Sequence, residues 1–136
     1  MENEIKVNEY ISRKEFLKKN DSNVAYSLLV QNNIKSDDYA RLNTGLICRV
    51  IGIRENSYNK KAIYFGVYEQ DWFDCSAVEN FSNNLKDLIE IGDLVKIEDN
   101  CGIAHWFEVY ENSEIYQYEI LEVVTKKMME TISYKV

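Results

Sequence analysis

The last third of the chain carries three strand-like runs in close succession, and this feature most constrains the fold. They span residues 94–97, 103–110 and 115–124. The first run follows a turn signal at Gly92-Asp93, and only short polar breaks separate the three. We therefore predict an antiparallel meander. A short helix capped by Thr125 and ending near Ile132 follows, and the apolar tail Tyr134–Val136 is expected to return to the sheet edge.

The N-terminal part of the sequence predicts two helices. Ser12 and Glu15 form a capping box, which begins a short helix that continues to about Lys19. Polar residues at 20–23 then offer a stop and a second N-cap. The apolar residues Val24, Ala25, Leu28 and Leu29 recur at helical spacing through about Gln31. This second helix is therefore expected to be amphipathic and to lie on a surface.

A loop and a hairpin are expected next. The polar residues 32–43 predict the loop, within which 37–42 could make one helical turn. Residues 46–53 and 62–68 are rich in β-branched and aromatic side chains. A turn cluster at 55–60 separates them, and this pattern is typical of a β-hairpin.

One inserted helix completes the predicted elements. Residues 71–76 are expected to form a loop, and 77–89 a helix with four apolar side chains on one face. Five strands with short connections and few helices favour a small five-stranded antiparallel barrel or meander, SH3-like or similar. The predicted fold is therefore α+β, with N-terminal helices, one inserted helix and a short C-terminal helix.

Length and charge exclude several classes of protein. With 136 residues the chain can bury one core, so we predict a single domain over 1–136, helical over about 10–43 and β-rich over about 45–136. A net charge of -7 argues against nucleic-acid binding, which needs clustered Lys and Arg. The charge favours a protein partner with a basic surface or, in the alternative, only keeps the protein soluble. No signal peptide or membrane span is recognisable, so we expect no membrane association and a cytoplasmic location.

The cysteines and the single histidine do not form a recognisable catalytic or metal motif. Cys48, Cys75 and Cys101 lack the close Cys-x-x-Cys pairs of zinc sites, so we predict free thiols and no metal or cofactor. Cys101 and His105 could act as nucleophile and base only if the turn after Asn100 folded back, because four residues of strand span about 13 Å. Glycine-rich phosphate loops and paired carboxylates are also missing, so we predict that the chain is not an enzyme.

Aromatic and acidic residues on the predicted strands form the candidate binding set. If Phe65, Phe107 and their alternating neighbours, which include Ile103, point inward, the residues between them point outward. On the next predicted strand Tyr116 and Tyr118 share a face, and Ile120-Leu121 breaks the alternation, which predicts a β-bulge. The predicted binding residues are Tyr64, Tyr68, Trp106, Glu108, Tyr110, Tyr116, Tyr118 and Glu119. In the alternative, the helix over 24–31 covers this face, or aromatic pairs simply stabilise the sheet.

Two C-terminal segments carry a recognisable pattern, formed by Leu88, Ile89, Ile91, Gly92, Asp93, Leu94 and Val95, then by Val124, Thr125, Lys126, Met129, Tyr134 and Val136. This pattern resembles that of small uncharacterised phage and prophage proteins of low-GC Gram-positive bacteria. The resemblance covers the last third of the chain. It departs from the family pattern at 96–98, which continues as strand where a further glycine turn is expected. The resemblance implies an origin in a mobile element more than an activity.

Three functional hypotheses follow. The first is a phage or mobile-element accessory protein that acts by binding, for example by inhibiting a host defence protein in an anti-CRISPR or similar anti-defence role. The second is a protein that sequesters a signalling nucleotide. The candidate nucleotide-binding residues are Arg41, Arg49, Arg54, Tyr58, Lys60 and Lys61. The third is a small enzyme that uses Cys101.

Overall fold

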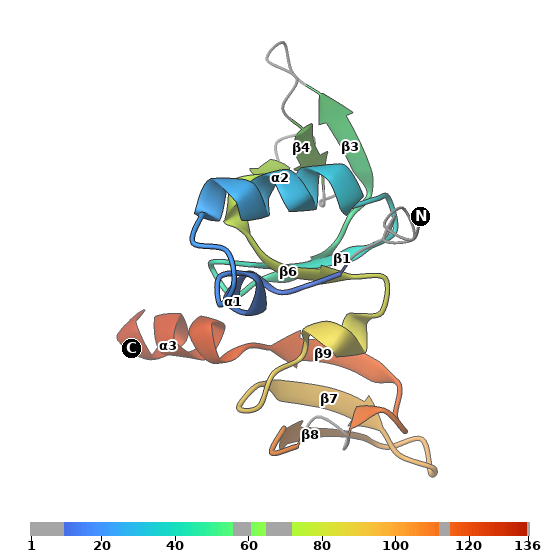
Figure 1. The fold of residues 1–136 in the computed structure, drawn as a ribbon. Helices are drawn as coiled ribbons and strands as arrows, with labels where there is room; N and C mark the ends of the chain where they lie inside the picture. The colour runs from blue at the N-terminus through green and yellow to red at the C-terminus, as the bar shows by residue number, and fades with distance from the viewer. Residues whose placement is uncertain (1–9, 56–60, 65–71, 112–114, 136) are drawn as a thin grey trace.

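A computed structural model describes residues 10–55, 61–64, 72–111 and 115–135, and the structural statements below concern these residues. They form a mixed α+β fold, which confirms the predicted class (Figure 1). The helices are α1 (Arg13–Phe16), α2 (Asn23–Asn33) and α3 (Lys126–Lys135), with the 3-10 turns η2 (Cys75–Ala77) and η3 (Leu85–Leu88).

The described strands form three antiparallel sheets of three strands each. The first has the order β2-β1-β6 and contains β1 (Tyr39–Leu42), β2 (Ile47–Arg49) and β6 (Val78–Ser82). The second has the order β3-β4-β5 and contains β3 (Gly52–Glu55), β4 (Lys61–Tyr64) and β5 (Trp72–Asp74). The third, called the C-terminal sheet below, has the order β8-β7-β9 and contains β7 (Leu94–Glu98), β8 (Ala104–Glu108) and β9 (Ile120–Val124). The described strands do not close into the predicted five-stranded barrel, and the C-terminal sheet does not follow meander order because β7 is central.

The apolar run 46–53 was predicted as one strand, but it is divided between two sheets. The ladder between β1 and β2 closes where the Val50 N–H donates to the Asp38 carbonyl at 2.7 Å and the Asp37 N–H donates to the Val50 carbonyl at 2.8 Å. The chain then leaves the first sheet, and Gly52 begins β3, which pairs with β4 in the predicted hairpin. Residues 72–74, which were expected to be a loop, form the third strand of that sheet.

The predicted helix over 77–89 is wrong. Val78 and Phe81 are fully buried because β6 pairs with β1, where Phe81 lies opposite Ala40. Asn84 then caps the short turn η3 by accepting from the Lys86 N–H at 3.1 Å. The same pairing explains why 37–42 is mainly the strand β1 and does not form a helical turn.

The predicted N-caps of the two N-terminal helices are confirmed. The Ser12 hydroxyl accepts from the Glu15 N–H at 3.2 Å, and the Ser22 hydroxyl accepts from the Ala25 N–H at 3.1 Å. The buried residues of α2 are Tyr26 and Val30, which differ from the predicted apolar face. Accordingly α2 packs on η2 and β6 and lies away from the C-terminal sheet (Figure 1).

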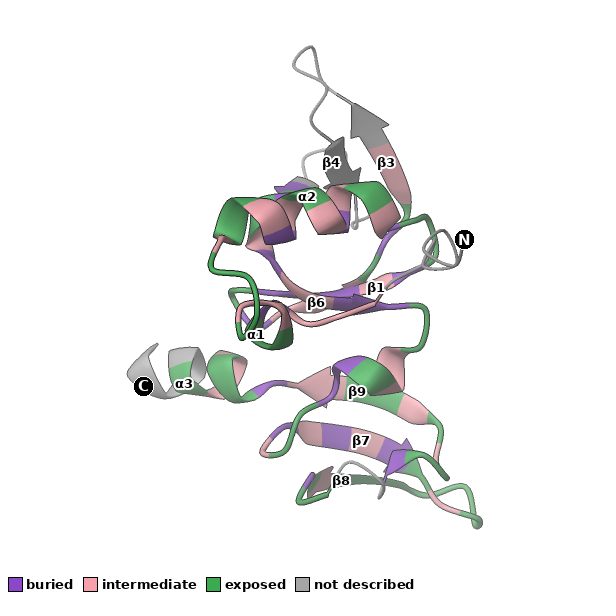
Figure 2. Cartoon of the chain, viewed as in Figure 1, coloured by how far each residue is buried: buried purple, intermediate pink, exposed green. Residues whose placement is uncertain are grey.

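The buried hydrophobic residues form two clusters, and Figure 2 colours the buried residues purple along the chain. The N-terminal core joins α2 to β1 and β6, with Tyr26 and Phe81 among its fully buried residues. The C-terminal core contains Ile89, Val95, Ile97, Val109 and Ile115. The single-domain organisation stays a prediction.

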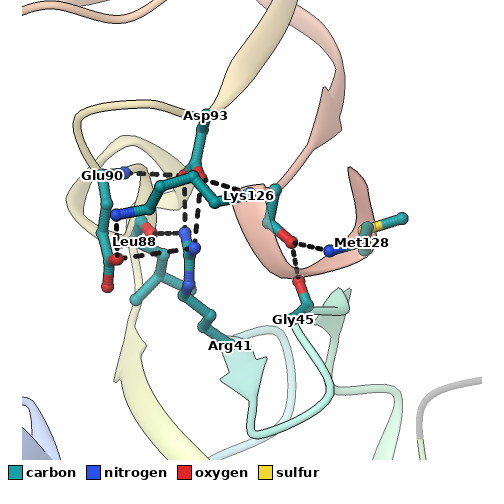
Figure 3. Close-up of polar contacts among 8 residues, drawn as sticks. Arg41, Gly45, Leu88, Glu90, Asp93, Lys126 and Met128 are labelled. Atoms are coloured by element: carbon teal, nitrogen blue, oxygen red, sulfur yellow. Dashed lines mark hydrogen bonds and ion pairs between the residues drawn. The ribbon is translucent and has the colours of Figure 1, made fainter. Parts of the chain in front are cut away.

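A buried ion pair joins the two parts of the chain (Figure 3). Arg41 on β1 donates to both carboxylate oxygens of Asp93, at 2.6 and 3.1 Å, and to the Leu88 carbonyl at 2.9 Å. Asp93 is fully buried and also accepts from the N–H groups of Glu90, at 2.8 Å, and Lys126, at 3.1 Å. This carboxylate therefore connects β1, the turn before β7 and the start of α3.

The C-terminal helix begins where the sequence predicts. The buried Thr125 hydroxyl accepts from the Met128 N–H at 3.3 Å and donates to the Gly45 carbonyl at 2.8 Å. Gly45 has a φ of 94°, and a Cβ there would lie 2.6 Å from the Thr125 hydroxyl oxygen, so glycine is required. The helix continues to Lys135, so the prediction that Tyr134 and Lys135 return to a sheet edge is wrong.

The last strand begins later than predicted and contains the predicted bulge. The backbone at 115–118 forms a turn, and β9 begins at Ile120. Lys96 pairs with Glu122 while Ile97 pairs with Ile120, so Leu121 is the extra residue.

Candidate functional site

The outer face of the C-terminal sheet carries an exposed tryptophan between charged side chains. Trp106 on β8 and Glu122 on β9 both pair with Lys96 on the central strand. The Lys96 ammonium lies 3.6 Å from a Glu122 carboxylate oxygen and 6.0 Å from the centre of the Trp106 ring. Alternation places Glu108 on the same face as Trp106. Trp106 is 45% exposed, so this face presents an aromatic surface bordered by carboxylates.

The inner face of the same sheet is covered only in part. Val95 and Ile97 are buried, whereas Phe107 is half-buried and packs edge-on against Tyr118, with ring centres 6.4 Å apart. Ile103 was expected to point into the core but is exposed, because it lies in the turn that precedes β8. A pocket of about 480 Å³ adjoins β8 here, and its lining residues are Ile97, Phe107, Glu108, Tyr110, Gln117 and Tyr118.

Tyr116 takes part in a different contact from Tyr118. Its hydroxyl donates to Asp87 at 3.2 Å, and its carbonyl accepts from the Lys86 ammonium at 3.1 Å. Burial and the Asp87 carboxylate raise the pKa of Tyr116. The prediction that Tyr116 and Tyr118 share a strand face is wrong, because the backbone forms a turn there. Glu119 is exposed and lines a second pocket, of about 670 Å³, beside Tyr39.

The structure brings together only part of the predicted binding set. Trp106 and Glu108 share the outer face, and Tyr110, which is 67% exposed, lines the inner pocket with Tyr118. Only the backbone of Tyr64 is described, in β4, and Tyr68 lies outside the described residues. Sequence reasoning missed Lys96 and Glu122. Lys96 lies between the apolar residues Val95 and Ile97, and this alternation was the signal that could have placed it on the outer face.

Asp99, in the turn between β7 and β8, pairs with His105 on β8. No contact between the Cys101 sulfur and this pair is described. His105 Nε2 lies 2.6 Å from Asp99 Oδ2, and the N–H groups of Cys101 and Ile103 both donate to Asp99 Oδ1 at 2.9 Å. Cys101 thus contributes its backbone N–H to this turn. The observed geometry explains a structural turn and gives no support to the hypothesis of a Cys101 nucleophile with His105 as its base.

The Asp99 contacts predict a measurable pH effect. Hydrogen bonds from His105, then from the N–H groups of Ile103 and Cys101, lower the pKa of Asp99. Since the folded-state pKa lies below the usual value of about 3.9, the contribution to stability is complete above that pH and is lost as the pH falls through the folded-state pKa. We expect His105→Ala to raise the pKa of Asp99 in a carboxyl NMR titration, with Glu122→Gln as the unaffected control. An unchanged Asp99 pKa in His105→Ala would contradict this assignment.

Two arginines considered for nucleotide binding are held by carboxylates. Arg41 is buried against Asp93, and Arg49 lies 2.6 Å from Asp37. Tyr58 and Lys60 lie outside the described residues, and only the backbones of Arg54 and Lys61 are described. Among the candidates whose side chains are described, Arg41 is therefore unavailable to an anionic ligand, and Arg49, which is exposed, has a carboxylate beside it.

The acidity of the chain is concentrated around the C-terminal sheet. Residues 84–125 contain ten Asp and Glu but only two Lys and no Arg, whereas the remaining residues contain thirteen acidic and fourteen basic side chains. Asp93 is buried against Arg41 and Glu90 lies beside Lys126, so these two carboxylates are paired with cations from outside the segment. The remaining carboxylates still outnumber the two lysines, one of which, Lys96, lies beside Glu122. A basic partner would therefore be attracted to this part of the molecule.

No group of His, Cys, Asp and Glu suited to a metal ion occurs in the described part of the chain. None of the described helices is long and apolar enough to span a membrane. Comparisons with protein-family models, curated proteins and solved structures gave no match to this chain.

Proposed function

We propose that the chain acts by binding a partner protein, whose basic surface docks on the outer face of the C-terminal sheet. The observation that carries the proposal is the position of the exposed Trp106 within a segment that holds ten carboxylates and two lysines. Tryptophan and tyrosine are frequent anchors at protein interfaces, and surrounding carboxylates select a partner rich in Lys and Arg.

Two further observations support this proposal over the alternatives. The α2 helix packs on η2 and β6, so it does not cover the outer face as one alternative required. The arginines that a nucleotide-binding site would need are paired at Arg41 and Arg49. From the C-terminal sequence resemblance we further propose that the partner is a bacterial protein, of which host defence proteins are one class.

Replacing Trp106 tests the proposed anchor. Because the side chain is exposed and its contact with Lys96 is long, Trp106→Ala should lower the free energy of unfolding by less than about 1 kcal/mol. A central aromatic anchor should nevertheless weaken partner binding by about 2 kcal/mol or more, which is roughly 30-fold. The matched control is Leu28→Ala, which truncates a similarly exposed side chain, 51% against 45%, on α2. If both variants bind equally well, Trp106 is not the anchor.

Charge reversal on the outer face tests the partner's chemistry. Proteins captured from a bacterial lysate by the wild-type chain are compared with those captured by Glu108→Lys/Glu122→Lys and by a control of equal charge, Asp21→Lys/Asp74→Lys. We expect a Lys- and Arg-rich protein that only the outer-face variant loses, and whose association with the wild type slows as salt rises. If the outer-face variant retains every captured protein, the proposal is wrong. If the wild-type chain binds a nucleotide and the outer-face variant keeps or improves that binding, the sequestering alternative replaces the proposal.

A further inference from the structure

The β8 strand forms an edge of the C-terminal sheet. The observed hydrogen bonds show which of its residues bond to β7 and which face the open side. The Asp99 N–H donates to the Ile103 carbonyl and the Val109 N–H donates to the Asp93 carbonyl, both at 2.9 Å. In an antiparallel pair, alternate residues bond to the neighbouring strand and those between them face away. The odd-numbered residues of β8 therefore bond to β7. Ala104, Trp106 and Glu108 direct their N–H and C=O groups to the open side of the strand.

The two edges of this sheet differ. The β9 edge is interrupted by the bulge at Leu121, which distorts the strand and disfavours further pairing. The β8 strand pairs in regular register over all five residues and contains neither Pro nor Lys, the residues that commonly protect an edge. Within the described residues, no strand pairs with this open side.

The inner pocket lies beside the same edge. It is lined by Phe107 on β8, Ile97 on β7 and Tyr118, so it can receive an apolar side chain. On the opposite face, a residue paired with Glu108 would meet a carboxylate. Peptides that add to a sheet edge gain affinity from backbone pairing and specificity from pockets for alternate side chains. The edge of β8 offers both.

We infer that an extended segment of the partner adds to β8 as a fourth strand. Its apolar side chains face the inner pocket, and its Lys or Arg side chains lie on the outer face beside Glu108. This inference rests on the proposed function and specifies its binding mode. Charge selects the occupant, because a second copy of this chain would bring a second excess of carboxylates to the same edge, whereas a basic segment neutralises it.

Three synthetic peptides test the inferred pairing. Each peptide has seven residues that alternate lysine and valine, and its ends are capped. The first is unmodified, the second carries a methyl group on the backbone nitrogen of every lysine, and the third carries one on the backbone nitrogen of every valine. When the peptide lies antiparallel to β8, the residues opposite Ala104, Trp106 and Glu108 carry the outward-facing lysines and donate their backbone N–H groups to β8, and the N–H groups of the valines face solvent. Methylation at lysine should therefore weaken binding by about tenfold or more, since several hydrogen bonds are lost, and methylation at valine should leave it nearly unchanged.

A substitution in the edge provides the complementary test. Ala104→Pro removes an N–H that β7 does not use, so an edge strand tolerates it, whereas Ala104→Val keeps the N–H. We expect the unmethylated peptide to bind the valine variant and not the proline variant, with folding checked by circular dichroism. The methylated peptides keep the inference testable if the proline variant does not fold.

The outcomes separate the binding mode from the proposed function. If all three peptides bind with equal affinity, and if salt lowers the three affinities equally, strand addition is overturned while the basic-partner proposal stands. If none binds at millimolar concentration, both are overturned. If the chain self-associates and Ala104→Pro abolishes this, the edge accepts a second copy and the basic occupant is wrong.

Discussion

Asp93→Ala is expected to lower the free energy of unfolding by about 3 to 5 kcal/mol, because it leaves a buried arginine without its counter-charge. Arg41 and Asp93 are both buried, and Asp93 accepts hydrogen bonds from Arg41 and from two backbone N–H groups. The alanine variant removes these acceptors at a site with little access to water. Urea-induced unfolding followed by circular dichroism measures the loss.

Glu90→Ala is the control for this prediction. Glu90 lies 3.5 Å from Arg41, but its side chain is half exposed, so its removal should cost less than about 1 kcal/mol. The double variant Arg41→Ala/Asp93→Ala should cost less than the sum of the single variants, because the charges are removed together. Equal losses for Asp93→Ala and Glu90→Ala would contradict the role of the buried ion pair.

Phe81→Ala should have an effect of similar size in the N-terminal core. Phe81 is fully buried on β6, and its ring lies 5.2 Å from the ring of Tyr10. Truncating a buried phenylalanine costs about 3 to 5 kcal/mol through lost burial and the cavity that remains. Phe107→Ala should cost less, because Phe107 is only half-buried, although strand alternation alone predicts a core position for it.

The same variant tests whether the two cores unfold together. Arg41 belongs to a strand of the N-terminal core and is bonded to Asp93 beside the C-terminal core, so a single domain should show one transition. We expect the Phe81→Ala curves followed by circular dichroism and by NMR signals of the C-terminal sheet to coincide. Separate transitions would show two domains, and equal losses for Phe81→Ala and Phe107→Ala would contradict the difference in burial.

Features fixed by neighbouring residues were predictable from the sequence. The caps at Ser12, Ser22 and Thr125 each use a hydroxyl and an N–H three residues later, so a short sequence pattern is enough to identify them. The bulge at Leu121 was visible as a break in strand alternation. The outward positions of Trp106 and Glu108 followed from the regular alternation of β8.

Features fixed by distant residues were not predictable in the same way. Val78 and Phe81 have a spacing that suits a helix, but their backbone pairs with β1, about forty residues earlier in the chain. Tertiary pairing of this kind overrides local periodicity. The aromatic set was dispersed for a related reason: residues 115–118 form a turn, so alternation does not apply to Tyr116 and Tyr118.

Amide hydrogen exchange of β8 tests the central claim most directly. The N–H groups of Ala104, Trp106 and Glu108 face the open edge, whereas those of His105 and Phe107 bond to β7. The free protein should therefore exchange the first three amides quickly and the other two slowly. Adding the unmethylated lysine–valine peptide should slow exchange at Ala104, Trp106 and Glu108 and shift their NMR signals. The claim is contradicted if the peptide leaves these three amides unchanged or protects residues in the N-terminal sheets in their place.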